Sequence, residues 1–146
     1  MEGEERMAMS GVRDVYEQAR KLYNDGDLEG LADCYTEDAV LVSPDGTARG
    51  RAAIREQWGR DKAAFPERVL TVDVILEQGD TLATEFTWVA TNTGPLVLPD
   101  GTELPPTGKQ VQTRGMELVQ VRDGKAAVHR LYWDNMAVAR QFGLLP

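Results

Sequence analysis

The hydrophobic pattern of this chain changes its period once, and that change limits the folds the chain can adopt. In the first 64 residues apolar side chains recur at helical spacing, which predicts helices at 11–24, 28–32 and 51–64. Pro66 prevents the third helix from continuing. From residue 68 onward the period is two, which is typical of strands. Helices followed by strands predict an α+β fold in which the helices cover one face of a sheet.

Four long strands are expected in the second half of the chain, after a short strand at 38–43. They span 68–77, 81–91, 109–121 and 125–134. Tight turn sequences join the first two strands and the last two, so we expect a mainly antiparallel sheet. Segment 92–108 is a long loop, and loops of that length inside a compact domain are often functional. A short helix from Met136 to Phe142 should follow the last strand.

Length, charge and cysteine content restrict the class of protein. A chain of 146 residues predicts one domain, which we place at 10–146, while the charged segment 1–9 is expected to be a flexible arm. The net charge of −8 argues against nucleic acid and anionic membranes as partners. Cys34 is the single cysteine, and no apolar run suits a signal peptide or a membrane span. We therefore expect a cytoplasmic protein without disulfides.

The dipeptide Asp123-Gly124 is a strong signal for a two-residue hairpin turn, in which Arg122 pairs with Lys125. An unbroken register from that turn places Asp134 opposite Thr113. It also divides the last strand into two faces, because strand side chains alternate. The face predicted to line a cavity carries Glu117, Arg130, Tyr132 and Asp134, and the opposite face carries His129, Leu131 and Trp133. A shift by one residue would instead turn His129 inward and Asp134 outward.

Asp134 is the first candidate for acid/base chemistry. Burial in an apolar pocket would raise the pKa of its carboxyl group, which suits a group that removes a proton and later returns it. The alternative role for Asp134 is to cap the helix that begins at Met136, and the residues alone favour this role.

Glu117 is the second candidate, because it faces Arg130 across the predicted hairpin. The two form either an exposed ion pair of little energetic value or a desolvated pair that orients substrate oxygens. His129 has no neighbouring cysteine, histidine or acid in the sequence pattern, so we expect no metal site. A structural or interface role for His129 is favoured, with a catalytic role as the alternative. The aromatic residues predicted to face inward either pack the core or form walls for a ligand: Tyr16, Trp58, Trp88 and Tyr132.

The C-terminal half resembles the SnoaL-like branch of the NTF2-like superfamily, whose members are often labelled polyketide cyclases or ester cyclases. The similarity rests on "PPTGK" before a strand, "RG" within it, "VRDGK", and "YWD" followed by a short helix and "FGLLP". The segment "ARGRAAIREQW" and the helical first half fit the same order of elements. The resemblance therefore covers about residues 10–146.

This resemblance implies a cone in which a curved mixed or antiparallel sheet and three N-terminal helices enclose a pocket, commonly as a homodimer. It implies a cofactor-independent aldol-type cyclase or isomerase acting on a small hydrophobic, polyketide-like carbonyl substrate. It also favours Asp134 as the acid that shuttles a proton, with Glu117 second. The residues expected to bind the substrate are Tyr16, Trp58, Trp88, Arg130 and Tyr132.

Three other functions stay open within the same superfamily. The first is a small-molecule-binding dimer module without catalysis, since a fold does not establish chemistry. The second is hydroxylation, which need not leave a motif. The third is epoxide hydrolysis, which the sequence disfavours because it contains no R-x-D on any strand.

Overall fold

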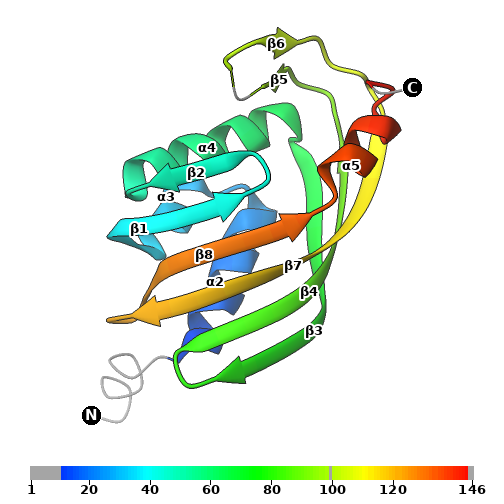
Figure 1. Ribbon diagram of the computed structural model, residues 1–146. Helices are drawn as coiled ribbons and strands as arrows, with labels where there is room; N and C mark the ends of the chain where they lie inside the picture. The colour runs from blue at the N-terminus through cyan, green and yellow to red at the C-terminus, as the bar shows by residue number, and fades with distance from the viewer. Residues whose placement is uncertain (1–10, 99, 145–146) are drawn as a thin grey trace.

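The computed structural model describes residues 11–98 and 100–144 (Figure 1). The predicted arm at 1–9 lies outside the described residues. The helices are α2 (Val12–Asp25), α3 (Leu28–Asp33), α4 (Arg51–Ala64) and α5 (Asn135–Gln141). The strands are β1 (Tyr35–Ser43), β2 (Gly46–Arg49), β3 (Glu67–Gln78), β4 (Thr81–Thr91), β5 (Leu96–Val97), β6 (Glu103–Leu104), β7 (Gln110–Arg122) and β8 (Lys125–Trp133).

The helices form where the apolar spacing predicts them. Helix α2 buries Val12, Val15, Tyr16 and Tyr23 on one face, and Gly26 ends it by adopting a left-handed conformation with φ of 77°. Helix α3 begins where the Asp27 side chain accepts a hydrogen bond from the Gly30 N–H. Helix α4 ends two residues before Pro66, as expected.

Six strands form one sheet in the order β2-β1-β8-β7-β4-β3, and β5 and β6 form a separate small hairpin. Neighbouring strands of the large sheet are antiparallel except β1 and β8, which are parallel. Figure 1 shows the long strands β3, β4 and β7 bending, with α2, α3 and α4 on the concave side. Helices and sheet meet in a core where Leu41, Ile54 and Leu82 are fully buried. The structure thus has the predicted α+β layout with a curved mixed sheet.

The long loop at 92–108 is attached to the fold at its two ends by one side chain. Asn92 is fully buried, and its amide donates to the carbonyl oxygens of Ala64 and Gly94. Its Oδ1 accepts hydrogen bonds from the backbone N–H and the hydroxyl of Thr107. Between these anchors the chain forms the β5–β6 hairpin, an element that the sequence pattern did not predict.

The hairpin turn at Asp123-Gly124 is confirmed, but the predicted register beyond it is wrong. Both turn residues have positive φ (53° and 77°), and Arg122 pairs with Lys125. The register then shifts where Gln120 pairs with Val128 and Val121 pairs with Ala126. Ala127 is the extra residue of this β-bulge, and one extra residue exchanges the two faces of the rest of the strand.

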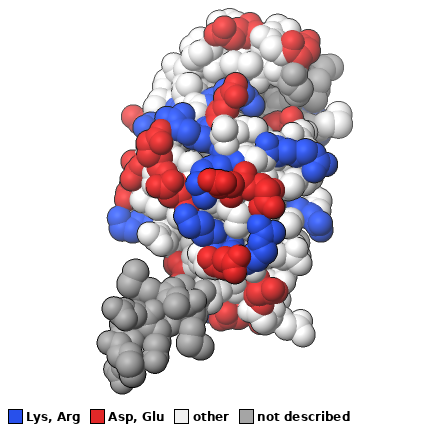
Figure 2. Space-filling model, turned by 90° about the vertical axis from the view of Figure 1, so that its left-hand side faces the viewer, with Lys and Arg blue, Asp and Glu red and all other residues white. Residues whose placement is uncertain are grey.

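Acidic and basic side chains are interspersed over the face of the molecule shown in Figure 2. Ion pairs occur between helices and within them, such as Arg55 with Glu29 and Arg60 with Glu56. Over the described residues of this face, no continuous cationic surface forms. Separately, none of the described helices combines the length and apolar character needed to span a membrane.

Candidate functional site

A cavity of about 670 Å³ lies between the concave side of the sheet and the helices. Its walls are mostly apolar, which is typical of sites for small organic ligands. The β5–β6 hairpin contributes Leu96, Val97 and Leu98 to the wall, and α5 contributes Val138. The long loop therefore takes part in forming the cavity.

The bulge at Ala127 decides which side chains of β8 reach this cavity. His129, Leu131 and Trp133 line it, whereas Arg130 and Tyr132 are exposed on the outer face. The predicted inward orientation of Arg130, Tyr132 and Asp134 is therefore wrong. The prediction fails because the extra residue, Ala127, reverses the alternation of side chains beyond it.

Asp134 takes the capping role that the residues alone favoured. Its side chain is exposed and accepts a hydrogen bond from the Ala137 N–H at 3.0 Å, at the first turn of α5. Glu117 likewise does not face Arg130; it pairs with Leu131, and Arg130 pairs with Leu118.

Four other residues singled out from the sequence do line the cavity: Tyr16, Trp58, Trp88 and Glu117. Tyr16 and Glu117 are in direct contact, since the Tyr16 hydroxyl donates to Glu117 Oε2 at 2.5 Å. The Trp88 indole lies elsewhere in the wall and donates to the Tyr23 hydroxyl at 2.9 Å.

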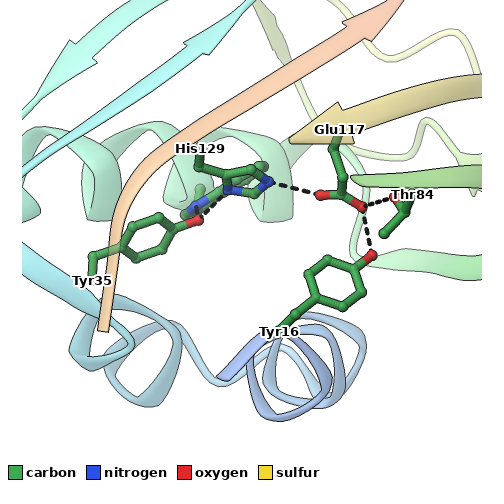
Figure 3. A network of polar contacts seen from close by, with 6 residues as sticks. Tyr16, Tyr35, Thr84, Glu117 and His129 are labelled. Atoms are coloured by element: carbon green, nitrogen blue, oxygen red, sulfur yellow. Dashed lines mark hydrogen bonds and ion pairs between the residues drawn. The ribbon is translucent and has the colours of Figure 1, made fainter. Parts of the chain in front are cut away.

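The centre of the site is a buried hydrogen bond between Glu117 and His129 (Figure 3). His129 Nε2 lies 2.7 Å from Glu117 Oε1, and the Glu117 residue is only 3% exposed. Thr84 donates a further hydrogen bond to Glu117 Oε2 at 2.9 Å. Each carboxylate oxygen therefore has at least one donor, as a buried carboxylate requires.

The donors around Glu117 determine its protonation state. Burial raises the pKa of Glu117, but the hydrogen bond and charge of His129 oppose it, together with the hydroxyls of Tyr16 and Thr84. The net result is a pKa below the ordinary value for glutamate, so Glu117 is ionised at neutral pH. An ionised carboxylate accepts hydrogen bonds only, and His129 Nε2 must carry a proton.

The second nitrogen of His129 contacts Tyr35, a residue of β1. Tyr35 Oη lies 2.7 Å from His129 Nδ1, and the Trp58 indole N–H donates to the same Oη at 3.3 Å. Burial raises the pKa of the Tyr35 hydroxyl, so Tyr35 stays protonated and donates to Nδ1 when the imidazole is neutral. Glu117, His129 and Tyr35 thus form a continuous series of hydrogen bonds along the cavity wall.

His129, Tyr35 and Thr84 were not predicted from the sequence as members of this site. One signal pointed to His129: the face of β8 that carries it also carries Leu131 and Trp133, and is more apolar than the face with Arg130. Tyr35 and Thr84 lie 94 and 45 residues before His129 in the chain, and no local pattern connects them with it. Among the described residues, no group of three or more His, Cys, Asp or Glu is arranged to hold a metal ion.

The sequence model of the SnoaL-like polyketide cyclases matches residues 13–142, so the chain belongs to that family. No curated protein matches the sequence at a significant level.

Several solved structures are similar to this one. AclR of Streptomyces galilaeus, a proposed hydroxylase, is 25% identical with a TM-score of 0.77, over 92% of this chain and 82% of AclR. IdmH of Streptomyces antibioticus, a proposed polyketide cyclase, is 29% identical with a TM-score of 0.75, over 90% of this chain and 98% of IdmH. An NTF2-like protein of Burkholderia pseudomallei is 17% identical with a TM-score of 0.75, over 92% and 98%, and supports the fold alone. The fold is NTF2-like, as the resemblance implied.

Proposed function

We propose that this protein is a cofactor-independent acid/base enzyme that acts on a small apolar carbonyl compound, with polyketide-derived ketones as the substrate class. The observation that carries the proposal is the series Glu117–His129–Tyr35, buried in the wall of an apolar cavity of about 670 Å³. Membership of the SnoaL-like family and the similarity to IdmH support a cyclase-type reaction.

An aldol closure needs one group that removes a proton next to a carbonyl and later returns it. In the proposed step, the Tyr35 oxygen takes the proton from the substrate carbon while the Tyr35 hydroxyl proton moves to His129 Nδ1. The C–H electron pair becomes an enolate, and ionised Glu117 stabilises the imidazolium through Nε2.

The enolate carbon then attacks a second carbonyl of the same molecule, which forms a C–C bond and an alkoxide. The alkoxide takes a proton from Tyr35, and Tyr35 regains one from His129 Nδ1. One proton leaves the substrate and one returns, so no co-reactant is consumed. An isomerase differs only in returning the proton to another carbon. Tyr16, Trp58 and Trp88 are assigned to the wall that holds the substrate.

The proposal is tested by hydrogen–deuterium exchange at the carbon next to the carbonyl of bicyclic ketones such as 2-tetralone, followed by NMR in D₂O. The protein should accelerate exchange above the buffer rate, and His129→Gln should reduce this acceleration by about 10²–10⁴-fold. Asp134→Asn is the matched control, because asparagine also caps helices and Asp134 is exposed. Exchange by the His129→Gln variant at the wild-type rate would refute the assignment.

A ligand-binding module without catalysis is the second candidate. The observation that favours it is that both His129 nitrogens and both Glu117 oxygens already have partners within the protein. Hydrogen bonds that are all made within the protein stabilise the fold whether or not these residues take part in catalysis. Ketone binding with no acceleration of exchange in the wild-type protein would establish this candidate.

We also propose that the outer face of the sheet pairs with a second copy of the chain. Val74, Met116 and Tyr132 lie in one cross-strand row of that face and are 46%, 54% and 58% exposed, and Leu76 beside them is 68% exposed. Sedimentation analysis should give a dimer, and Met116→Glu with Tyr132→Glu should give a monomer. A monomeric wild-type protein at micromolar concentration would refute this.

A further inference from the structure

A second buried polar cluster lies in the same cavity, away from Glu117. It consists of Asp61 on α4, Tyr23 on α2 and Arg68 on β3. Tyr23 Oη donates to Asp61 Oδ2 at 2.9 Å, and Arg68 Nε forms an ion pair with the same oxygen at 3.0 Å. None of these residues was singled out from the sequence.

The Tyr23 hydrogen bond and the Arg68 ion pair both reach one oxygen of Asp61 and leave the other free. Within residues 11–98 and 100–144, no side chain or backbone N–H donates to Oδ1. Asp61 lines the cavity, and a fifth of its side chain remains accessible (20%). Asp61 Oδ1 is therefore the position at which a ligand in the cavity can contact this carboxyl group.

The surroundings of Asp61 shift its ionisation toward the neutral form. Burial raises the pKa of Asp61 to about 6, although the charge of Arg68 and the hydrogen bond from Tyr23 oppose this, and the nearby charge of Asp45 raises it further. A ligand that displaces the remaining water adds to the desolvation and favours the protonated acid. A protonated carboxyl group donates one hydrogen bond, which an ionised carboxylate cannot do.

We propose that Asp61, as a neutral carboxylic acid, donates a hydrogen bond to a carbonyl or quinone oxygen of the ligand. This inference rests on the proposed function, because the ligand occupies the same cavity as the Glu117–His129 pair. It specifies the substrate class: a neutral, flat molecule with oxygen acceptors at two positions, one held by Asp61 and the other near Tyr35.

Trp58 supports a single ligand that contacts both clusters. Its ring centre lies 5.4 Å from that of Tyr23 and 6.3 Å from that of His129, so one aromatic side chain of the cavity wall adjoins both polar clusters. A flat ring system lying along Trp58 would bring its oxygens toward the two clusters together.

The alternative is that Asp61 only neutralises Arg68. The Arg68 side chain is 1% exposed and its guanidinium lies 4.1 Å from the centre of the Tyr23 ring. Its Nε and Nη2 have no hydrogen-bond partner among the described residues. A buried arginine needs a counter-charge. This role alone predicts ligand binding that does not depend on the ionisation of Asp61.

The test compares two probes of the same shape, 9-fluorenone and fluorene, which differ by one carbonyl oxygen. Their dissociation constants are measured by fluorescence titration from pH 5 to pH 8. The protonated fraction of Asp61 falls about tenfold for each pH unit above its pKa. The affinity advantage of the ketone over the hydrocarbon should therefore fall by about tenfold or more over this range in the wild-type protein.

Asp61→Asn should make this advantage independent of pH. Asp45→Asn is the matched control, because Asp45 lines the same cavity without the Tyr23 and Arg68 contacts. It should retain the pH dependence, with a midpoint at lower pH, because it removes a charge that raises the pKa of Asp61. Glu117→Gln should also retain it, so failure of the acid/base function and failure of this inference are distinguished. The proposal would be overturned if the affinity advantage of the ketone over the hydrocarbon did not change with pH in the wild-type protein. A pH dependence of this advantage that persists in Asp61→Asn would also overturn it.

Tyr23→Phe provides a second variant that keeps the Asp61–Arg68 pair. It removes a hydrogen bond that lowers the pKa of Asp61. The midpoint of the pH dependence should therefore move to higher pH. An unchanged midpoint would contradict Asp61 as the titrating group.

Discussion

The cavity contains two buried carboxyl groups with similar partners and opposite protonation behaviour. Glu117 and Asp61 each contact a tyrosine hydroxyl and a basic side chain. The pKa of Glu117 is lowered, whereas burial raises that of Asp61 to about 6.

The difference between them lies in how the donors are distributed. Glu117 has three side-chain donors spread over both oxygens, from Tyr16, Thr84 and His129. Asp61 has one hydrogen-bond donor, Tyr23, and an ion pair with Arg68, both on a single oxygen. Desolvation acts on both groups, and the number of hydrogen bonds to the charged form decides whether it is outweighed. The same apolar cavity thus holds one carboxylate that stays ionised and one carboxyl group that takes up a proton at mildly acidic pH.

The largest expected difference between Glu117 and Asp61 is in steady-state kinetics, measured with a ketone that the wild-type protein converts. Glu117→Gln removes the charge that stabilises the imidazolium and should lower kcat by about 10²–10³-fold with little change in KM. Asp61→Asn should raise KM by about tenfold and change kcat less, because Asp61 is assigned to binding. Equal losses of kcat in both variants would end the distinction between the two groups.

Substitution of Glu117 should cost more stability than substitution of Asp134, the exposed carboxylate that the family resemblance favoured as the catalytic acid. Glu117→Ala leaves the hydroxyls of Tyr16 and Thr84 and the His129 N–H without their acceptor, and should lower the free energy of unfolding by about 3 kcal/mol. Asp134→Ala removes only a helix cap, at a cost of about 1 kcal/mol. Urea unfolding of both variants measures the difference. Similar losses would show that the buried network contributes no more than a cap.

Thr84→Val removes one donor to Glu117 while preserving side-chain shape. It should cost about 1 kcal/mol in urea unfolding and raise the pKa of Glu117, since the Thr84 hydrogen bond lowers it. The pKa is followed by NMR of the Glu117 carboxyl carbon during an acid titration. A pKa unchanged from that of the wild-type protein would show that the other donors alone keep Glu117 ionised.

The smallest expected effect is a difference in how the two groups change stability with pH. The folded pKa of Glu117 is depressed, so its contribution is present above the unfolded value of about 4.3 and is lost as pH falls through the folded value. The folded pKa of Asp61 is raised, so this group favours unfolding increasingly as pH rises from about 4 through about 6. Urea unfolding of the wild-type protein, Glu117→Gln and Asp61→Asn between pH 3 and 8 checks both directions. Differences from the wild-type protein that stay constant with pH would contradict both assignments.

Several elements of the fold could be predicted from local patterns. The helix at 51–64 and the strand at 81–91 have the predicted bounds, and the other principal strands differ by a few residues at most. Local period, caps and turn residues determine these elements, because each depends on neighbours within a few positions. The short strands β2, β5 and β6 were missed, since two to four residues give too little pattern to detect.

The candidate site was harder to predict, and the β8 strand explains why. The turn at Asp123-Gly124 was correct, but one bulged residue, Ala127, reversed every orientation beyond it. Ala127 is one of two adjacent alanines, and neither glycine nor proline marks the bulge. The error exchanged His129, which contacts Glu117, for Asp134, which caps a helix.

The sequence by itself determined the family, the order of helices and strands, and the turn that begins the last hairpin. These follow from residues close together in the chain. The tertiary structure alone decided the register of β8, the contact of Tyr35 with His129, and the pairing of Asp61 with Arg68. Each of these joins distant elements or depends on where one extra residue fits when a curved sheet closes around its core. Burial and hydrogen-bond partners, which determine the pKa of a carboxyl group, exist only after that packing has formed.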